Sequence, residues 1–239
     1  MSPLERASFV AVLALTVSGA LLADDSPPVP LEGLAQADRA EVERIHGQPT
    51  LTCPLEKKDV AATVEIYEFL LDRLDFTGRI VRRFRMGDYE ITAMGADAFH
   101  IDDGDGAVAD ARLLYQGPQG EGWTRRLYLA KGFFEILGSV RIYGDALIVL
   151  DYRAREERVL ETVATIDFKA RNDTLDRLGR AAEKALRVVV AKKAALFITA
   201  AKDASELVLS GASRVDERLR DDPDVRRDQL EEFRAAFLE

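Results

Sequence analysis

The chain is poor in the side chains that most often carry catalysis. Its 239 residues include one cysteine, Cys53, and two histidines, His46 and His100. A single thiol cannot form an intramolecular disulfide, and it excludes a zinc site built on several cysteines. Cys53 is expected to be a buried apolar residue. Histidine is the commonest general base, but His100 alternates with Phe99 and Ile101 in a predicted strand and is expected to point to solvent. We therefore assign no catalytic residue.

The sequence also lacks the short motifs that mark common nucleotide and hydrolase sites. It contains no G-x-G-x-x-G between a strand and a helix, no P-loop and no G-x-S-x-G elbow. The segment from Asp102 to Gly106 combines acids and glycines, but counting from Asp103 places Leu114 where a calcium loop needs glutamate. We interpret this segment as a hairpin turn. The sequence therefore indicates no cofactor and no metal.

Positive charge is in the minority. The chain has 42 acidic and 33 basic residues, which gives a net charge of -9. A basic footprint is absent, so we expect no nucleic-acid partner. The basic residues are 25 arginines and only 8 lysines. This excess of arginine is compatible with phosphate recognition, although genomic base composition is the alternative that we favour.

The first 23 residues have the layout of a secretory signal peptide. A short start with Arg6 precedes the uncharged run ASFVAVLALTVSGALL, and the small residue Ala23 stands before Asp24. The 16 residues of this run fall short of the roughly 20 that cross a bilayer. We expect cleavage and export to the periplasm or the extracellular space. An uncleaved N-terminal membrane anchor is the alternative.

The remaining chain divides into three expected segments. Residues 24–48 form a proline-rich leader, and residues 49–210 form the main domain. Residues 211–239 contain 15 charged side chains in 29 positions. We expect this last segment to be a charged helical tail on the surface.

The main domain is predicted to begin with a strand and two short helices. Residues 51–55 alternate in hydrophobicity, which weakly favours a strand. Asp59 is a candidate N-cap for a helix with apolar residues at helical spacing. Gly78 interrupts that pattern, and a second short helix is predicted from Arg79 to Met86.

Six or seven antiparallel strands and a long helix are expected to follow. Between residues 88 and 170 the hydrophobic period is two, and short turns separate the runs. Gly144 and Asp145 are predicted to form a two-residue hairpin turn. The long helix is predicted from Asn172 or Asp173 to about Ser210, with Gly211 ending it.

This order of elements resembles the START-like, or SRPBCC, helix-grip superfamily of lipid and small-hydrophobe binders. The resemblance covers residues 49–210, from the stretch LTCPLEKKDVAATVEIYEFLLDRL to the long helix. It implies an α+β fold whose antiparallel sheet of six to seven strands wraps around or packs on the long C-terminal helix. Two short helices would follow the first strand. The resemblance also implies an apolar cavity between the sheet and the helix.

Aromatic residues of the predicted strands are candidates for lining such a cavity. Inward-pointing tyrosines and phenylalanines would supply apolar walls and polar contacts, and plain core packing is the alternative for each. With two residues from the long helix, the candidates are Tyr89, Phe99, Tyr115, Tyr128, Tyr152, Phe168, Leu186 and Phe197.

Three arginines share one face of the second short helix. Arg79, Arg82 and Arg83 would suit anionic head groups. A solvated helix face is the alternative that we favour.

The sequence thus predicts an exported protein without catalysis that binds a hydrophobic small molecule or lipid between sheet and helix. One alternative is an envelope structural or interaction protein with a solid core, which would hold its partner through the charged tail or the arginine cluster. A peripheral membrane contact is compatible with either hypothesis. A third hypothesis is a hydrolase or cyclase that uses tyrosine, aspartate or histidine in the cavity.

Overall fold

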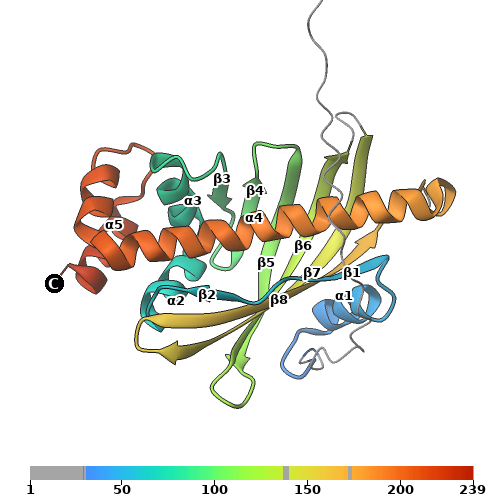
Figure 1. Cartoon of the computed structure of the whole chain (residues 1–239), viewed down its shortest axis with the longest axis horizontal. Helices are drawn as coiled ribbons and strands as arrows, with labels where there is room; N and C mark the ends of the chain where they lie inside the picture. The colour runs from blue at the N-terminus through green and yellow to red at the C-terminus, as the bar shows by residue number, and fades with distance from the viewer. Residues whose placement is uncertain (1–28, 30, 137–139, 172–173, 239) are drawn as a thin grey trace, which may run out of the picture.

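The computed structural model describes residues 29, 31–136, 140–171 and 174–238, without the side chains of 174–185 and 196. The predicted signal peptide, residues 1–23, lies outside the described residues. The chain is α+β, with an antiparallel sheet and a long helix laid across one face (Figure 1). The elements are α1 (Gln36–His46), β1 (Leu51–Pro54), β2 (Lys58–Val60), α2 (Val64–Asp72), α3 (Leu74–Arg83), β3 (Glu90–Ala93), β4 (Ala98–Asp102), β5 (Ala107–Pro118), β6 (Thr124–Ile136), β7 (Val140–Glu156), β8 (Val159–Ala170), α4 (Thr174–Leu219) and α5 (Arg227–Phe237).

The sheet is a meander, and the N-terminal strand β1 forms one of its edges. Its order is β1-β8-β7-β6-β5-β4-β3, and all neighbours are antiparallel. Strand β2 also pairs with β8, next to β1 along the same edge. The predicted fold class is confirmed, with eight strands because residues 51–60 supply two short strands.

Helix α4 covers one face of the sheet, which we call the inner face. Leu186 and Val190 of α4 pack there against Phe168. The C-terminal half of α4 joins α2, α3 and α5 in a second core at one end of the sheet (Figure 1). No helix among the described residues has the length and apolar character needed to cross a membrane.

Helix α1 packs on the opposite, outer face. Val42 and Ile45 of α1 are buried against Leu127 and Leu147 of the sheet. Helices therefore cover both faces of the sheet, and its strands bury side chains that point to either face.

The helices after β1 begin at other residues than the sequence predicts. Asp59 lies in β2 opposite Glu161 and caps no helix. The N-cap of α2 is Thr63, whose hydroxyl accepts a hydrogen bond from the backbone N–H of Ile66. Gly78 lies inside α3, where its missing Cβ lets Ile91 of β3 approach closely.

The predicted hairpin turn at Gly144 and Asp145 is wrong. Both residues lie within β7, which is continuous over 17 residues. A Cβ at Gly144 would overlap the ring of Phe168, so this glycine serves a close approach and not a turn. Asp145 is buried and accepts a hydrogen bond from Arg171 at 2.8 Å.

The C-terminal residues are more deeply packed than their charge indicates. Helix α4 continues through Gly211 to Leu219, because one helical glycine costs only about 1 kcal/mol among good helix formers. Leu230 and Phe233 of α5 are buried, and the Phe233 ring lies 5.5 Å from that of Phe76. The predicted surface tail thus completes the core next to α2 and α3.

Candidate functional site

A cavity of about 180 Å³ lies between the inner face and α4. Strands β5, β6 and β7 form its floor, and α4 lies above them. The residues of α4 that line it are Val190, Lys193, Ala194 and Phe197.

The side chains on the floor of the cavity are small and leave space beneath α4. In an antiparallel sheet, directly opposed residues point to the same face, so cross-strand neighbours form rows. Two such rows cross the three floor strands beneath α4. They are Ala109, Gly132 and Gly144 in one row, and Ala111, Ala130 and Ala146 in the next.

Aromatic rings surround this floor. Phe134 and Phe168 lie with ring centroids 5.5 Å apart. Phe197 of α4 and Tyr89 complete the wall. The cavity is therefore apolar over most of its lining, as pockets for hydrophobic ligands are.

One side of the cavity is polar. The Nζ atom of Lys193 lies 2.6 Å from Oδ2 of Asp103 and 3.1 Å from Oδ2 of Asp105. Burial alone would lower the pKa of Lys193, but its hydrogen bonds to these two carboxylates raise it above the ordinary value. Burial and the same carboxylates raise the pKa of Tyr89 to about 12. At neutral pH the wall thus presents an ammonium group, held by carboxylates, and a neutral phenol.

The structure brings three of the predicted cavity residues together. Tyr89, Phe168 and Phe197 all line the cavity. Phe99 and Leu186 are buried in the cores beside it.

Tyr128 and Tyr152 lie on the inner face but belong to a packed polar cluster beneath α2. The Tyr152 hydroxyl donates to Glu68 at 2.7 Å. The rings of Tyr152 and Tyr67 meet edge to face with centroids 5.2 Å apart. Arg126 lies beside them, fully buried. These tyrosines fill the core at the end where α2 covers the sheet.

Tyr115 lies on the other side of the sheet. A bulge between Leu113 and Tyr115 shifts the register of β5. The alternation reverses there, so Tyr115 packs with Leu127 on the outer face. The prediction that it lines the cavity is wrong for this reason.

Two of the three predicted anion-binding arginines are engaged in ion pairs. Arg79 lies 3.2 Å from Asp224, and Arg83 binds the buried carboxylate of Asp222. Arg82 is exposed and has no ion-pair partner among the described residues. The trio is therefore partly neutralised.

Both histidines lie on the outer side of the sheet and do not face the cavity. His100 is on the outer face, with Nδ1 2.7 Å from Asp110. His46 ends α1, and its Nδ1 lies 2.6 Å from the buried Asp167. Within the described ranges, no group of three His, Cys, Asp or Glu residues is placed to hold a metal ion. Cys53 is buried, and burial raises the pKa of its thiol.

The floor residues are the part of the site that the sequence analysis misses. Residues 107, 109 and 111 are all alanine, at the period of two that marks one face of a strand. Small residues in place of the usual large ones signal space above a sheet, and this signal is present in the sequence.

No protein-family model matches the chain, and no curated protein matches its sequence. The chain is similar to several solved structures. A conserved protein from Geobacillus kaustophilus is 13% identical with a TM-score of 0.43, and the match covers 68% of this chain and 97% of that one. A hypothetical protein from Helicobacter pylori is 9% identical with a TM-score of 0.42, over 75% and 99% of the two chains. The di-domain ARO/CYC StfQ from the steffimycin biosynthetic pathway is 16% identical with a TM-score of 0.31, over 71% and 54%.

Proposed function

We propose that the protein binds a small hydrophobic molecule, or the end of a lipid chain, in the cavity beneath α4. The observation that carries this proposal is the pair of alanine and glycine rows on the floor. Protein interiors are close-packed, and voids larger than a water molecule are few. A floor built from six small residues keeps a space open where larger side chains would close it.

The volume limits the ligand. An apolar cavity of about 150 Å³ takes up benzene, so the 180 Å³ beneath α4 suits one ring or a short alkyl segment. An aromatic group of this size buries about 150–250 Å². At roughly 25 cal/mol per Å² this burial contributes about 4–6 kcal/mol. Association also costs translational and rotational freedom, so the Kd should be no tighter than tens of micromolar.

The polar wall favours a ligand with one polar end. Lys193 and Tyr89 face the same cavity as the apolar rings. The phenol of Tyr89 can donate or accept a hydrogen bond. The three donors of the Lys193 ammonium group already bind Asp103 and Asp105, so Lys193 contributes positive charge to this wall. Because Lys193, Asp103 and Asp105 already bind one another, the arrangement supports binding and orientation of a ligand more than catalysis.

The cellular setting and the family are part of the proposal. The signal-like N-terminus supports export, so we place the binding activity outside the cytoplasm. The confirmed order of sheet and long helix supports a helix-grip type of ligand binder.

Alanine-methyl NMR tests the proposal. With ¹³C-labelled alanine methyl groups, titration with indole should shift the signals of Ala109, Ala130 and Ala146. The signal of Ala154, which is exposed near the end of β7, should stay in place. The matched variants are Ala146→Leu and Ala154→Leu, both on β7. We expect at least a tenfold loss of indole affinity in the first and none in the second; equal affinity in both would overturn the proposal.

A further inference from the structure

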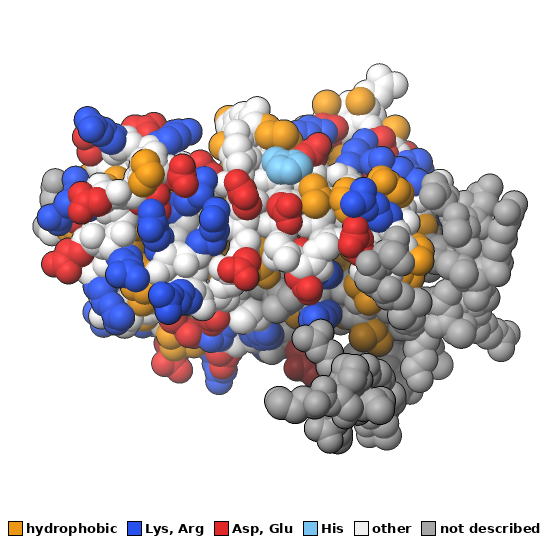
Figure 2. Space-filling view, turned by 90° about the horizontal axis from the view of Figure 1, so that it is seen from above, with side chains coloured by type: hydrophobic (Ala, Val, Ile, Leu, Met, Phe, Trp, Pro, Cys, Tyr) orange, Lys and Arg blue, Asp and Glu red, His pale blue; other side chains and the backbone are white. Residues whose placement is uncertain are grey.

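A second concave site lies at the end of the molecule where α3 ends and α4 finishes. This groove has a volume of about 670 Å³ and is lined by Arg83, Phe84, Arg85, Arg214, Glu217 and Arg218. At about 1.5 Å per helical residue, its α4 residues lie roughly 25–35 Å along the helix from the cavity. Basic side chains gather at this end of the molecule, with acidic ones between them (Figure 2). We call it the arginine groove.

The arginines of this groove differ from most others in the described chain. Most of the other described arginines pair with carboxylates, as Arg141 does with Glu135 at 2.9 Å and Arg155 with Asp59 at 3.0 Å. Three exposed arginines of the groove have no ion-pair partner among the described residues: Arg85, Arg214 and Arg218.

The charge in the groove is not balanced locally. Arg83 is neutralised by Asp222, and the lining contains one further carboxylate, Glu217. The three unpaired guanidinium groups therefore leave an excess of positive charge in a chain whose net charge is -9. An uncompensated cluster of this kind attracts anions.

The backbone at Arg85 points to a role for its side chain. Arg85 follows α3 with a φ of 58°, in the left-handed region. Helices often end with a residue in this conformation, and glycine is favoured there because it has no Cβ. Its backbone N–H still donates to the carbonyl of Arg82, so the turn itself needs no arginine side chain. An arginine at a position that favours glycine indicates that the guanidinium group is used.

The groove is also partly preorganised. The guanidinium of Arg214 lies over the ring of Phe84, 5.6 Å from its centroid. Arg214 and Arg218 are four residues apart on α4, so they share one face of the helix. Stacking of this kind reduces the freedom that the side chain loses when it binds an anion.

We propose that the arginine groove binds a phosphate group with two or more negative charges, carried by a free molecule or by a lipid head group. Arg85, Arg214 and Arg218 would hold its oxygens. The planar guanidinium fork donates two parallel N–H bonds and matches phosphate oxygens better than an ammonium group does. The site is separate from the cavity, so it stands whether or not the cavity binds a hydrophobe.

Calorimetric titration of the full chain with inorganic pyrophosphate tests this site. We expect binding that weakens with added salt, as charge-driven binding does. The double variant Arg214→Glu/Arg218→Glu should lose at least tenfold in affinity. The control Arg39→Glu/Arg158→Glu makes the same change in net charge at exposed residues of α1 and the β7–β8 turn. It should lose less than twofold.

Co-sedimentation with vesicles identifies the source of the phosphate. Neutral phosphatidylcholine vesicles are compared with the same vesicles containing phosphatidic acid, with the same variants. If the groove variant loses binding to pyrophosphate but not to phosphatidic acid vesicles, the natural ligand is a free phosphate compound. If it loses binding to phosphatidic acid vesicles, the ligand is a lipid head group. Equal losses in the groove and control variants, or a wild-type chain that binds neither probe, would overturn the proposal. Circular dichroism confirms that both variants are folded.

Discussion

Ala130 presents a single methyl group to the floor of the cavity, between Ala111 and Ala146. Replacing it with valine adds two methyl groups to empty space. We predict that Ala130→Val raises the free energy of unfolding by about 1 kcal/mol, since each buried methylene contributes about 0.8 kcal/mol. Indole affinity should fall at the same time, because the valine side chain fills space that indole would occupy. Urea unfolding measures the first effect, with Ala154→Val as the exposed control. A destabilised Ala130→Val chain would show that the space is already filled.

Gly144 is required by its neighbour across the strands. A Cβ there would overlap the ring of Phe168. We predict that Gly144→Ala lowers the free energy of unfolding by about 1–3 kcal/mol, the usual cost of overpacking. Adding Phe168→Leu should restore part of the loss. Gly95 has open space around its Cα, so Gly95→Ala is the control and should change stability little.

Arg85 combines a stability cost with the function that we propose. Replacing it with glycine removes both the strained conformation and the guanidinium group. We predict that Arg85→Gly raises the free energy of unfolding by about 1 kcal/mol and weakens pyrophosphate binding. Chemical unfolding and calorimetry on one protein sample test both. A variant that is more stable and binds equally well would remove Arg85 from the site.

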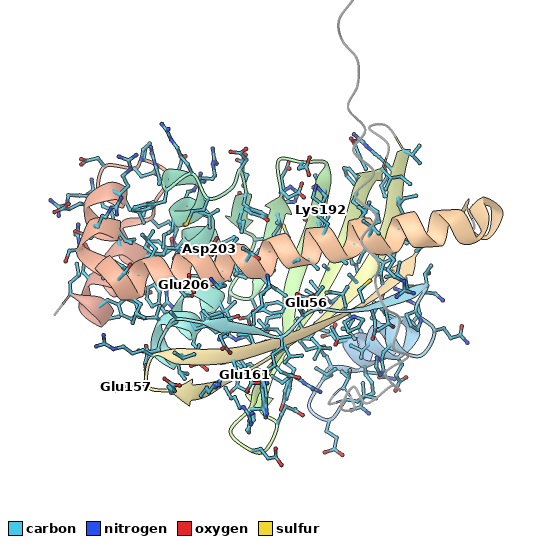
Figure 3. All side chains as sticks on the ribbon, viewed as in Figure 1. Glu56, Glu157, Glu161, Lys192, Asp203 and Glu206 are labelled. Atoms are coloured by element: carbon cyan, nitrogen blue, oxygen red, sulfur yellow. The ribbon has the colours of Figure 1, made fainter. Side chains whose placement is uncertain are left out.

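At the scale of elements, Lys193 fastens α4 to the turn between β4 and β5. Its side chain is 14% exposed, and Asp103, its partner, is 10% exposed. The neighbouring Lys192 is 64% exposed and lies 3.7 Å from Asp105. Lys192 lies along the exposed length of α4 with Asp203 and Glu206 (Figure 3). The two lysines thus make a matched pair of positions.

We predict that Lys193→Met destabilises the chain by about 1–3 kcal/mol, because the mostly buried Asp103 loses its ion-pair partner and keeps only backbone hydrogen bonds. Amide hydrogen exchange in residues 186–200 should accelerate, since α4 is released from the turn. Lys192→Met should change neither quantity by a comparable amount. Equal effects of the two substitutions would contradict this role of Lys193.

Periodicity predicts the elements well where a single requirement shapes the sequence. Strands β3 to β6, strand β8 and the long helix α4 follow directly from periods of two and 3.6, whereas β7 is predicted as two strands. The role of a glycine is not predictable from its local sequence, because glycine occurs in turns, at helix ends and at close approaches of the backbone alike. Gly144 and Gly211 look like breaks locally, but one lies under Phe168 and the other inside α4.

The candidate site is predictable to a similar extent. Tyr89 and Phe168 line the cavity as the strand alternation predicts. Tyr115 does not, because a bulge between Leu113 and Tyr115 reverses the alternation and no local signal marks it. The arginine groove joins Arg85 to Arg214, which are far apart in the chain, so only the tertiary structure brings them together.

For the whole molecule, the free energy of unfolding should fall at both acidic and alkaline pH. Hydrogen bonds from Arg83 hold the pKa of Asp222 below its ordinary 3.8, and Lys131 and Arg44 do the same for Glu41 below 4.5. The unfolded chain therefore binds these protons first on acidification, and stability falls below about pH 4. The phenol of Tyr89, with its pKa raised from 10.0 to about 12, keeps its proton longer when folded.

At alkaline pH, the dependence of stability on pH has the opposite sign. Between about pH 10 and 12 the unfolded chain has released the tyrosine proton that the folded chain retains, so stability falls as pH rises. Urea unfolding from pH 3 to pH 11 should show a plateau between these limits. Tyr89→Phe should make the alkaline arm less steep without abolishing it, because burial also raises the pKa values of Tyr67, Tyr128 and Tyr152. An unchanged alkaline arm would contradict the raised pKa of Tyr89.

The central claim is that the space beneath α4 is an apolar binding site. The most direct measurement is a crystal structure of the protein soaked with bromobenzene, read by the anomalous signal of bromine. We predict one strong bromine peak between Ala130 of β6 and Phe197 of α4, absent in Ala146→Leu. A wild-type crystal with no peak in this cavity, and side chains closed over the alanine floor, would contradict the account.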